Sequence, residues 1–204
     1  MNKINNNSNP PNYLSKTNIK DLFEAVGKVK IRSGTLPNKY IDLALKLGIY
    51  AGLRVSEMAK LTPSNIYIDN EFKEIRVLDS KRGRSRNIPL FPGALLSILN
   101  YLNLENNHIN NLNKPYIPLS TRQIWVRIKK VYNLANIKYG GTHQLRHTFA
   151  RRMIGIGWLG MTDVQYLLGH SSTQITQRYI DAQFTSNNQY INEAMLKINK
   201  IDNE

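Results

Sequence analysis

Between residues 66 and 90 the apolar residues change their spacing, and this change limits the folds open to the chain. Elsewhere they recur every three or four positions, which is typical of amphipathic helices. Within this segment they alternate with polar residues in three short runs. The alternating residues are Ile66 and Ile68, Ile75 and Val77, and Ile88 and Leu90. We therefore expect a mainly α fold with a small three-stranded antiparallel β-sheet (α+β).

Capping residues and glycines mark where the helices begin and end. Ser120 followed by Gln123 forms a capping box, and Asn38 is a candidate N-cap for another helix. Thr162 is expected to cap a short helix that stops at Gly169, because glycine readily adopts the left-handed conformation of a helix end. Further helices are expected to begin near residues 17, 55, 92, 142, 172 and 187.

The length of the chain indicates one globular unit. Its 204 residues are enough for one domain with a substantial core. Residues 1–13 are rich in Asn and Pro and are expected to form a disordered tail, followed by a single domain over residues 14–185. Residues 186–204 are expected to contain a C-terminal helix with an apolar stripe. That stripe leaves two possibilities open, packing in its own core or docking on a neighbouring protomer.

Charge and cysteine content limit the partners and the compartment. The chain has 28 Lys and Arg residues against 14 Asp and Glu, a formal charge of +14, which indicates a polyanionic partner such as nucleic acid. It has no cysteine, which excludes disulfides and thiolate metal sites and fits a reducing compartment. No apolar run approaches the roughly 20 residues of a membrane span. We expect a cytoplasmic, nucleoid-associated protein, or one from the equivalent reducing compartment of an organelle.

His143 and Arg146 are the first candidates for chemistry. Three positions apart on a helix, they are neighbours on one face and can address one ligand, although a solvated polar face is the simpler alternative. His143 and His147 have the spacing seen in zinc peptidases, but Gln144 stands where such a motif needs a glutamate. No third ligand is evident and the surrounding charge is positive, so we expect no metal site.

Tyr179 is a candidate nucleophile, although an isolated tyrosine among eleven is more often a packing residue. With a pKa near 10, less than about 1% of a tyrosine is ionised at pH 7, so a nucleophilic tyrosine needs cations or a base beside it. Arg146 and His170 are the nearest candidates in sequence. His170 also has a simpler role open to it, bonding the terminal carbonyls of the helix that ends at Gly169.

A basic segment, SKRGRS, connects the second and third expected strands over residues 80–85. Such charge runs are commonly solvated, and the functional alternative is contact with phosphates. Basic residues here and on the helix after residue 120 are candidate DNA contacts. They are Arg82, Arg84, Arg86, Arg127, Lys129 and Lys130.

Taken together, these residues resemble the tyrosine recombinase (phage integrase) family, whose catalytic domains carry Arg, Lys, His-x-x-Arg, His or Trp, and Tyr in this order. The resemblance covers residues 12–182 and makes residues 14–185 a tyrosine recombinase catalytic domain. It is similar in layout to Xer-type members and to short members that invert fimbrial promoter segments. The matching residues are Arg54 in GLRVSE, Lys81 in SKRGRSRNIPL, His143 and Arg146 in THQLRHTFA, His170 in LLGHSS and Tyr179 in QRYID.

The resemblance implies cleavage of DNA through a 3′-phosphotyrosyl intermediate. Tyr179 would attack the scissile phosphate and release a 5′-hydroxyl, while Arg54 and Arg146 would bind the non-bridging oxygens. His170 would donate a further hydrogen bond. Preorganised donors of this kind are each worth roughly 3 to 4 kcal/mol in the transition state.

Proton transfer is implied for two further residues. Arginine cannot release a proton at neutral pH whereas lysine can, so Lys81 is the expected acid for the leaving 5′-oxygen. His143 would assist proton transfer. Because one phosphoester replaces another, neither a metal nor ATP nor any other cofactor is expected.

The expected partner is double-stranded DNA, bound by a homo-tetramer that is a monomer or weak oligomer when free. Integration, excision, inversion and resolution all remain open. A type IB topoisomerase, which shares the chemistry but recloses the same strand, is the closest alternative. A non-catalytic DNA-binding protein is the alternative from another class, and salt-dependent binding without cleavage would identify it.

Overall fold

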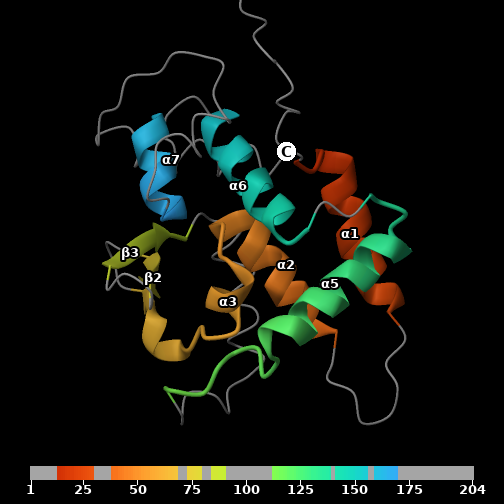
Figure 1. The fold of residues 1–204 in the computed structure, drawn as a ribbon, viewed down its shortest axis with the longest axis horizontal. Helices are drawn as coiled ribbons and strands as arrows, with labels where there is room; N and C mark the ends of the chain where they lie inside the picture. The colour runs from red at the N-terminus through yellow and green to blue at the C-terminus, as the bar shows by residue number, and fades with distance from the viewer. Residues whose placement is uncertain are drawn as a thin grey trace, which may run out of the picture.

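The computed structural model describes residues 13–29, 38–68, 73–79, 84–90, 112–138, 141–155 and 159–169. The small sheet lies at one side of the molecule, and the helices pack along its inner side and above it (Figure 1). None of the helices in these ranges is long and apolar enough to cross a membrane. The helices expected near residues 92, 172 and 187 lie outside the described residues, as does the N-terminal tail up to residue 12.

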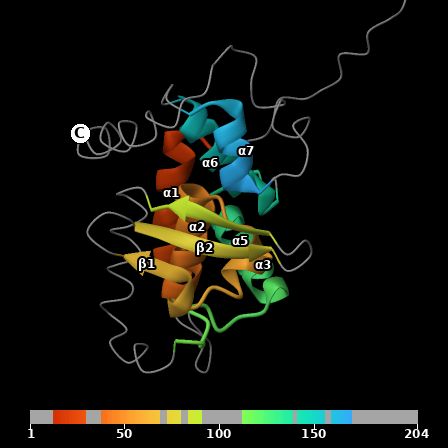
Figure 2. The same cartoon turned by 90° about the vertical axis from the view of Figure 1, so that its left-hand side faces the viewer.

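The sheet has the predicted three antiparallel strands in the order β1-β2-β3. They are β1 (Ile66–Ile68), β2 (Lys73–Asp79) and β3 (Arg84–Pro89). Ile75 pairs with Ile66 on one side and Ile88 on the other, and both Ile75 and Ile88 are fully buried. Figure 2 shows the outer face of the sheet, with α2 and α3 behind it. The alternation in the sequence therefore located all three strands and the buried face of β2 and β3, whereas Ile68 of β1 is 42% exposed.

Six α-helices and one 3-10 turn account for the other described elements. They are α1 (Lys16–Lys28), α2 (Lys39–Ala51), α3 (Val55–Met58), η1 (Pro63–Asn65), α5 (Thr121–Leu134), α6 (His143–Gly155) and α7 (Met161–Leu168). The predicted capping box of α5 is confirmed. The Gln123 N–H donates to Ser120 Oγ at 3.3 Å, and the Ser120 N–H donates to Gln123 Oε1 at 2.9 Å.

Of two further capping predictions, the position of Asn38 as the N-cap of α2 is confirmed, and Thr162 as the N-cap of α7 is wrong. Asn38 lies at the start of α2, but its side chain makes no cap bond there and instead donates to the carbonyls of Val26 and Val29, at 3.0 and 2.8 Å. It thus ties the end of α1 to the start of α2. The N-cap of α7 is Gly160, whose N–H donates to Asp163 Oδ2 at 2.9 Å, so Thr162 lies inside the first turn.

Two glycines of α2 let α6 approach closely. A Cβ added at Gly48 would lie 2.8 Å from Leu145 Cβ, and one added at Gly52 would lie 2.5 Å from Phe149 Cδ1. Gly52 also ends α2 in the left-handed conformation, with a φ of 63°. Leu145 and Phe149 are fully buried, as predicted for the inner face of α6. This close packing fixes the position of Arg146, which lies between them in sequence.

The described core has two parts. The larger one is formed by α1, α2, α3, the sheet and α5, and it includes Leu145. The smaller one lies between α6 and α7 and includes Phe149, Met153 and Leu168. Helix α6 contributes to both, and Arg146, between Leu145 of the larger part and Phe149 of the smaller one, is buried with them.

Candidate active site

A pocket of about 230 Å³ opens where the first turn of α6 meets α3. It brings together three residues that the sequence predicted as catalytic, Arg54, His143 and Arg146. The complete lining is Leu53, Arg54, Val55, Ser56, Thr121, Thr142, His143 and Arg146. Residues 54 and 146 are thus joined at one site as the resemblance implied.

Arg146 is held inside the protein and is only 3% exposed. Its Nη1 donates to the Gly52 carbonyl at 2.7 Å, and its Nη2 donates to the Leu168 carbonyl. The first contact crosses the close α2–α6 packing, and the second reaches the end of α7. Because these bonds hold the guanidinium in one plane, Arg146 presents a preorganised cation to the pocket.

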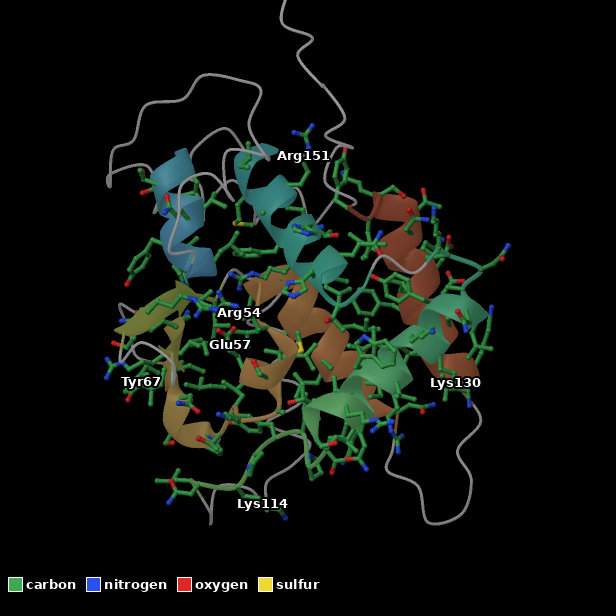
Figure 3. The ribbon with its side chains drawn as sticks, in the orientation of Figure 1. Arg54, Glu57, Tyr67, Lys114, Lys130 and Arg151 are labelled. Carbon is green, nitrogen blue, oxygen red and sulfur yellow. The ribbon has the colours of Figure 1, made fainter. Side chains whose placement is uncertain are left out.

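Arg54 lies in the turn between α2 and α3, and its side chain is 30% exposed. Its backbone N–H donates to Glu57 Oε2 at 2.7 Å, and its Nη1 donates to Glu57 Oε1 at 2.8 Å. Its Nη2 donates to the Gly169 carbonyl at 2.9 Å. Figure 3 shows Arg54 and Glu57 close together between α3 and the sheet. The guanidinium is therefore fixed by one carboxylate and one backbone carbonyl.

Glu57 also accepts two bonds from Arg86, whose Nη1 and Nη2 each lie 2.9 Å from a different carboxylate oxygen. Burial alone would raise the pKa of Glu57. The hydrogen bonds and charge of Arg86, the backbone N–H of Arg54 and the charge of Arg146 outweigh burial, and the pKa lies below its ordinary value. Glu57 is therefore an anion shared by two arginines.

The end of α7 is bound by three arginines at once. The carbonyls of three consecutive residues, Leu167, Leu168 and Gly169, accept from Arg86 Nε, Arg146 Nη2 and Arg54 Nη2 respectively. The last carbonyls of a helix have no partner within it and carry its negative dipole end, so cations are favoured there. In this way α7 supports the same two arginines that line the pocket.

The two histidines of α6 are held in their neutral form. Partial burial of its ring, followed by the charges of Arg146 and Arg54, lowers the pKa of His143. Burial, followed by the charges of His143 and Arg146, lowers the pKa of His147 to about 4. A neutral imidazole at pH 7 can accept a proton, which is the role that the sequence predicted for His143.

Lys81, Arg82, His170 and Tyr179 lie outside the described residues. Arg84 is the first residue of β3 and pairs with Asp79 across the sheet. Two of these residues, Lys81 and Arg82, belong to the segment 80–83 that joins β2 to β3 in the chain. His170 directly follows Gly169 at the end of α7.

The other predicted DNA contacts divide into one buried residue and three on α5. Arg86 is 5% exposed and bonds Glu57 and Leu167, so the expected surface contact with a phosphate does not fit its place in the interior. Lys129 and Lys130 are exposed and Arg127 is half-buried. Figure 3 shows Lys130 on α5, on the opposite side of the molecule from Tyr67 on β1.

Three residues of this region, Glu57, Thr121 and Thr142, were not among the predicted site residues. Glu57 had a detectable signal, because it stands three residues after Arg54 at a helix start, where a carboxylate commonly caps the preceding N–H. Thr121 and Thr142 bring hydroxyl groups to the pocket from the first turn of α5 and the residue before α6. Nothing in their local sequence indicated that they would meet.

The arrangement fits an anion with tetrahedral geometry. Two oriented guanidiniums and a neutral imidazole face one small pocket, which suits the non-bridging oxygens and the transferred proton of a phosphodiester. Among the described residues, no three His, Asp or Glu side chains lie together as a metal site would require.

The fold is that of tyrosine recombinase catalytic domains. The crystal structure of XerA recombinase matches with a TM-score of 0.65 and 24% identity, over 93% of this chain and 66% of that one. A XerH site-specific recombinase bound to difH substrate matches with a TM-score of 0.64 and 18% identity, over 91% of this chain and 53% of that one.

The sequence comparisons identify the family. Residues 12–186 match the phage integrase family. Tyrosine recombinase XerA of Pyrococcus furiosus is 32% identical over 199 residues, which cover 95% of this chain and 64% of that relative. The chain therefore belongs to the phage integrase family, as its motifs predicted. It spans less than two thirds of the length of that relative.

Proposed function

We propose that the chain is a site-specific DNA recombinase that cleaves and rejoins strands through a 3′-phosphotyrosyl intermediate. The observation that carries the proposal is the convergence of Arg54, His143 and Arg146 on one pocket, in a chain that belongs to the phage integrase family. A protein that only binds DNA has no need of two arginines oriented by internal bonds toward one small site.

In the proposed reaction, the hydroxyl oxygen of Tyr179 forms a bond to the scissile phosphorus and the bond from phosphorus to the 5′-oxygen breaks. Arg54 and Arg146 stabilise the charge on the non-bridging oxygens. His143 assists removal of the tyrosine proton, and Lys81 supplies a proton to the leaving 5′-oxygen. His170 donates a further bond to the phosphate. Reversal of these steps with a 5′-hydroxyl from another strand completes the exchange.

The proposed substrate is double-stranded DNA, and the proposed active assembly is a homo-tetramer on DNA. The excess of 14 positive charges favours binding to the phosphate backbone. XerH, a related fold, has been crystallised on its difH substrate. We place the catalytic domain at residues 14–185 and a C-terminal helix within residues 186–204, which either packs in its own core or docks on a neighbouring protomer.

The experiment uses a duplex taken from inverted repeats that flank the gene, with a nick placed so that the cleaved fragment diffuses away. The wild-type chain should form a covalent adduct with the labelled strand in the presence of EDTA, because no step needs a metal. Tyr179→Phe should abolish the adduct and keep most of the DNA binding.

Each other outcome points to a different function. Relaxation of supercoiled DNA without exchange between two sites would indicate a topoisomerase of the IB type. Binding that weakens steeply with salt, with no adduct on any duplex tested, would contradict catalysis and indicate a DNA-binding protein.

A further inference from the structure

A buried arginine that does not line the pocket, Arg86, contacts both sides of the candidate active site. Across the sheet Arg86 pairs with Val77, which faces the interior, and Arg86 itself is 5% exposed. A buried guanidinium requires partners for its charge and its N–H groups. Those partners are Glu57 on α3 and the end of α7.

On the α3 side, Arg86 fixes the orientation of Glu57. Its two bonds of 2.9 Å form a fork that allows the carboxylate plane one arrangement. In that arrangement Glu57 accepts from both the backbone N–H and the Nη1 of Arg54. The direction of the Arg54 guanidinium therefore depends on Arg86 through one shared carboxylate.

On the α7 side, Arg86 binds the same backbone segment, residues 167–169, that accepts a hydrogen bond from Arg54. Its Nε donates to the Leu167 carbonyl at 2.8 Å, while the Gly169 carbonyl accepts from Arg54. The guanidinium packs directly against Gly169, where an added Cβ would lie 3.0 Å from Arg86 Nη1.

We propose that Arg86 is a positioning residue of the strand-cleavage reaction, acting through Glu57 and the end of α7 without contacting DNA. The inference rests on the proposed function for its reaction, and on the contacts of the described residues for its geometry. Arg86 contacts both supports of Arg54, since it binds the Glu57 carboxylate directly and, beside the Gly169 carbonyl, binds the Leu167 carbonyl and packs against Gly169.

The test compares Arg86→Lys with Arg76→Lys. Lysine keeps the charge but cannot form the fork and the Nε bond together. Arg76 is the matched control, since it lies on the neighbouring strand β2 with an exposed side chain and does not contact Glu57. At saturating DNA, Arg86→Lys should lower the rate of adduct formation at least tenfold while the Kd for DNA stays within threefold. Arg76→Lys should stay within twofold of wild type.

A folded Arg86→Lys variant that forms the adduct at the wild-type rate would overturn the proposal. A double-mutant cycle with Glu57→Gln checks the route of the effect. If Arg86 acts through Glu57, the effect of Arg86→Lys should shrink at least threefold in the Glu57→Gln background. If Arg86→Lys lowered the rate by the same factor in the Glu57→Gln background as in wild type, that route would be contradicted.

Two further measurements keep the test decisive. Should Arg86→Lys fail to fold, the double variant Glu57→Gln/Arg86→Met is used instead, because it removes both buried charges together. Its rate of adduct formation should still be at least tenfold below that of wild type. Should wild type form no adduct, the proposed function fails but the geometry can be tested alone. Side-chain ¹⁵N NMR should then show slow guanidinium rotation for Arg54 in wild type and Arg76→Lys and faster rotation in Arg86→Lys, and unchanged rotation would overturn the inference.

Discussion

The hydrogen-bonded arginines around the pocket and the exposed lysines of α5 carry the same charge in opposite settings. Arg54, Arg86 and Arg146 each donate at least two hydrogen bonds to protein oxygens. Lys129 and Lys130 are exposed, and Lys129 Nζ lies 5.4 Å from the centre of the Trp125 ring. Charge alone therefore does not distinguish a cation held in one orientation from a cation that adds only to the positive electrostatic potential of the surface.

The difference between the two regions predicts different responses to mutation. A fixed guanidinium contributes through its direction, so even a substitution that keeps the charge should be costly. An exposed lysine contributes through long-range attraction to phosphates, which salt screens. Mutations near the pocket should thus change rates and stability, and mutations on α5 should change affinity.

The largest expected effect is that of Arg54→Lys. The charge remains, but the bonds to Glu57 and Gly169 that orient the planar group are lost. The rate of adduct formation at saturating DNA should fall by about 10² to 10³, the usual cost of one transition-state donor. Single-turnover kinetics on the nicked duplex measure it. A loss of less than tenfold would show that charge, not geometry, matters at this position.

The next effect concerns the close packing that positions Arg146. Gly52→Ala places a side chain on a residue with a φ of 63° and 2.5 Å from Phe149 Cδ1. Left-handed strain and overpacking together should lower the free energy of unfolding by about 2 to 4 kcal/mol in urea titrations. The control is Gly27→Ala on α1, where an added Cβ has nothing within 4 Å, and it should be neutral or slightly stabilising.

A smaller effect is expected from pH, through His147. Its pKa is about 4 in the folded protein and near its ordinary value of 6.5 in the unfolded chain. The stabilisation is therefore complete above about pH 6.5 and is lost as the pH falls toward 4, because the unfolded chain binds the proton first. Between pH 7.5 and 5 this should cost about 1 to 2 kcal/mol, allowing for solvent screening.

Urea unfolding at the two pH values tests this prediction. His147→Gln should reduce the loss of stability between them, while Glu57 affects a different range, below its ordinary value of 4.5. An unchanged pH dependence in His147→Gln would contradict the prediction.

The smallest effect is expected on α5. The double variant Lys129→Ala/Lys130→Ala should raise the Kd for DNA by less than about tenfold at low salt, and each lost phosphate contact should reduce the slope of log K against log salt by about 0.9. Lys20→Ala on α1, also exposed, is the matched control. A slope identical to that of the control would remove α5 from the DNA-binding surface.

Patterns that repeat along the chain predicted much of the fold. The alternation over residues 66–90 gave the sheet, and the Ser120 capping box gave the start of α5. Arg86 was predicted as a DNA contact, although it lies two residues before Ile88 on the same strand and so faces the same buried side. Its charge suggested the surface instead, and only its pairing with Glu57 explains how the interior accommodates it.

Contacts between distant segments were the part that the sequence could not supply. Asn38 has the local signature of a cap, yet its amide bonds the end of the preceding helix. Arg54 and Arg146 were chosen for their residue types and motifs, but their shared supports at Gly52, Leu168 and Gly169 depend on three-dimensional packing. Local propensity describes each segment, whereas a site of this kind is assembled from several.

Helix α7 consists of eight residues, too few to be stable in isolation. The carbonyls of Gly169, Leu167 and Leu168 at its end accept hydrogen bonds from three arginines. These arginines lie 115, 81 and 22 residues away in the chain, respectively. These bonds form only when the rest of the domain is in place, so the docking of α7 and the alignment of the arginines are one event. Under the proposed function, strand cleavage therefore requires a completed fold, because a chain with α7 undocked would lack the bonds that align Arg54 and Arg146.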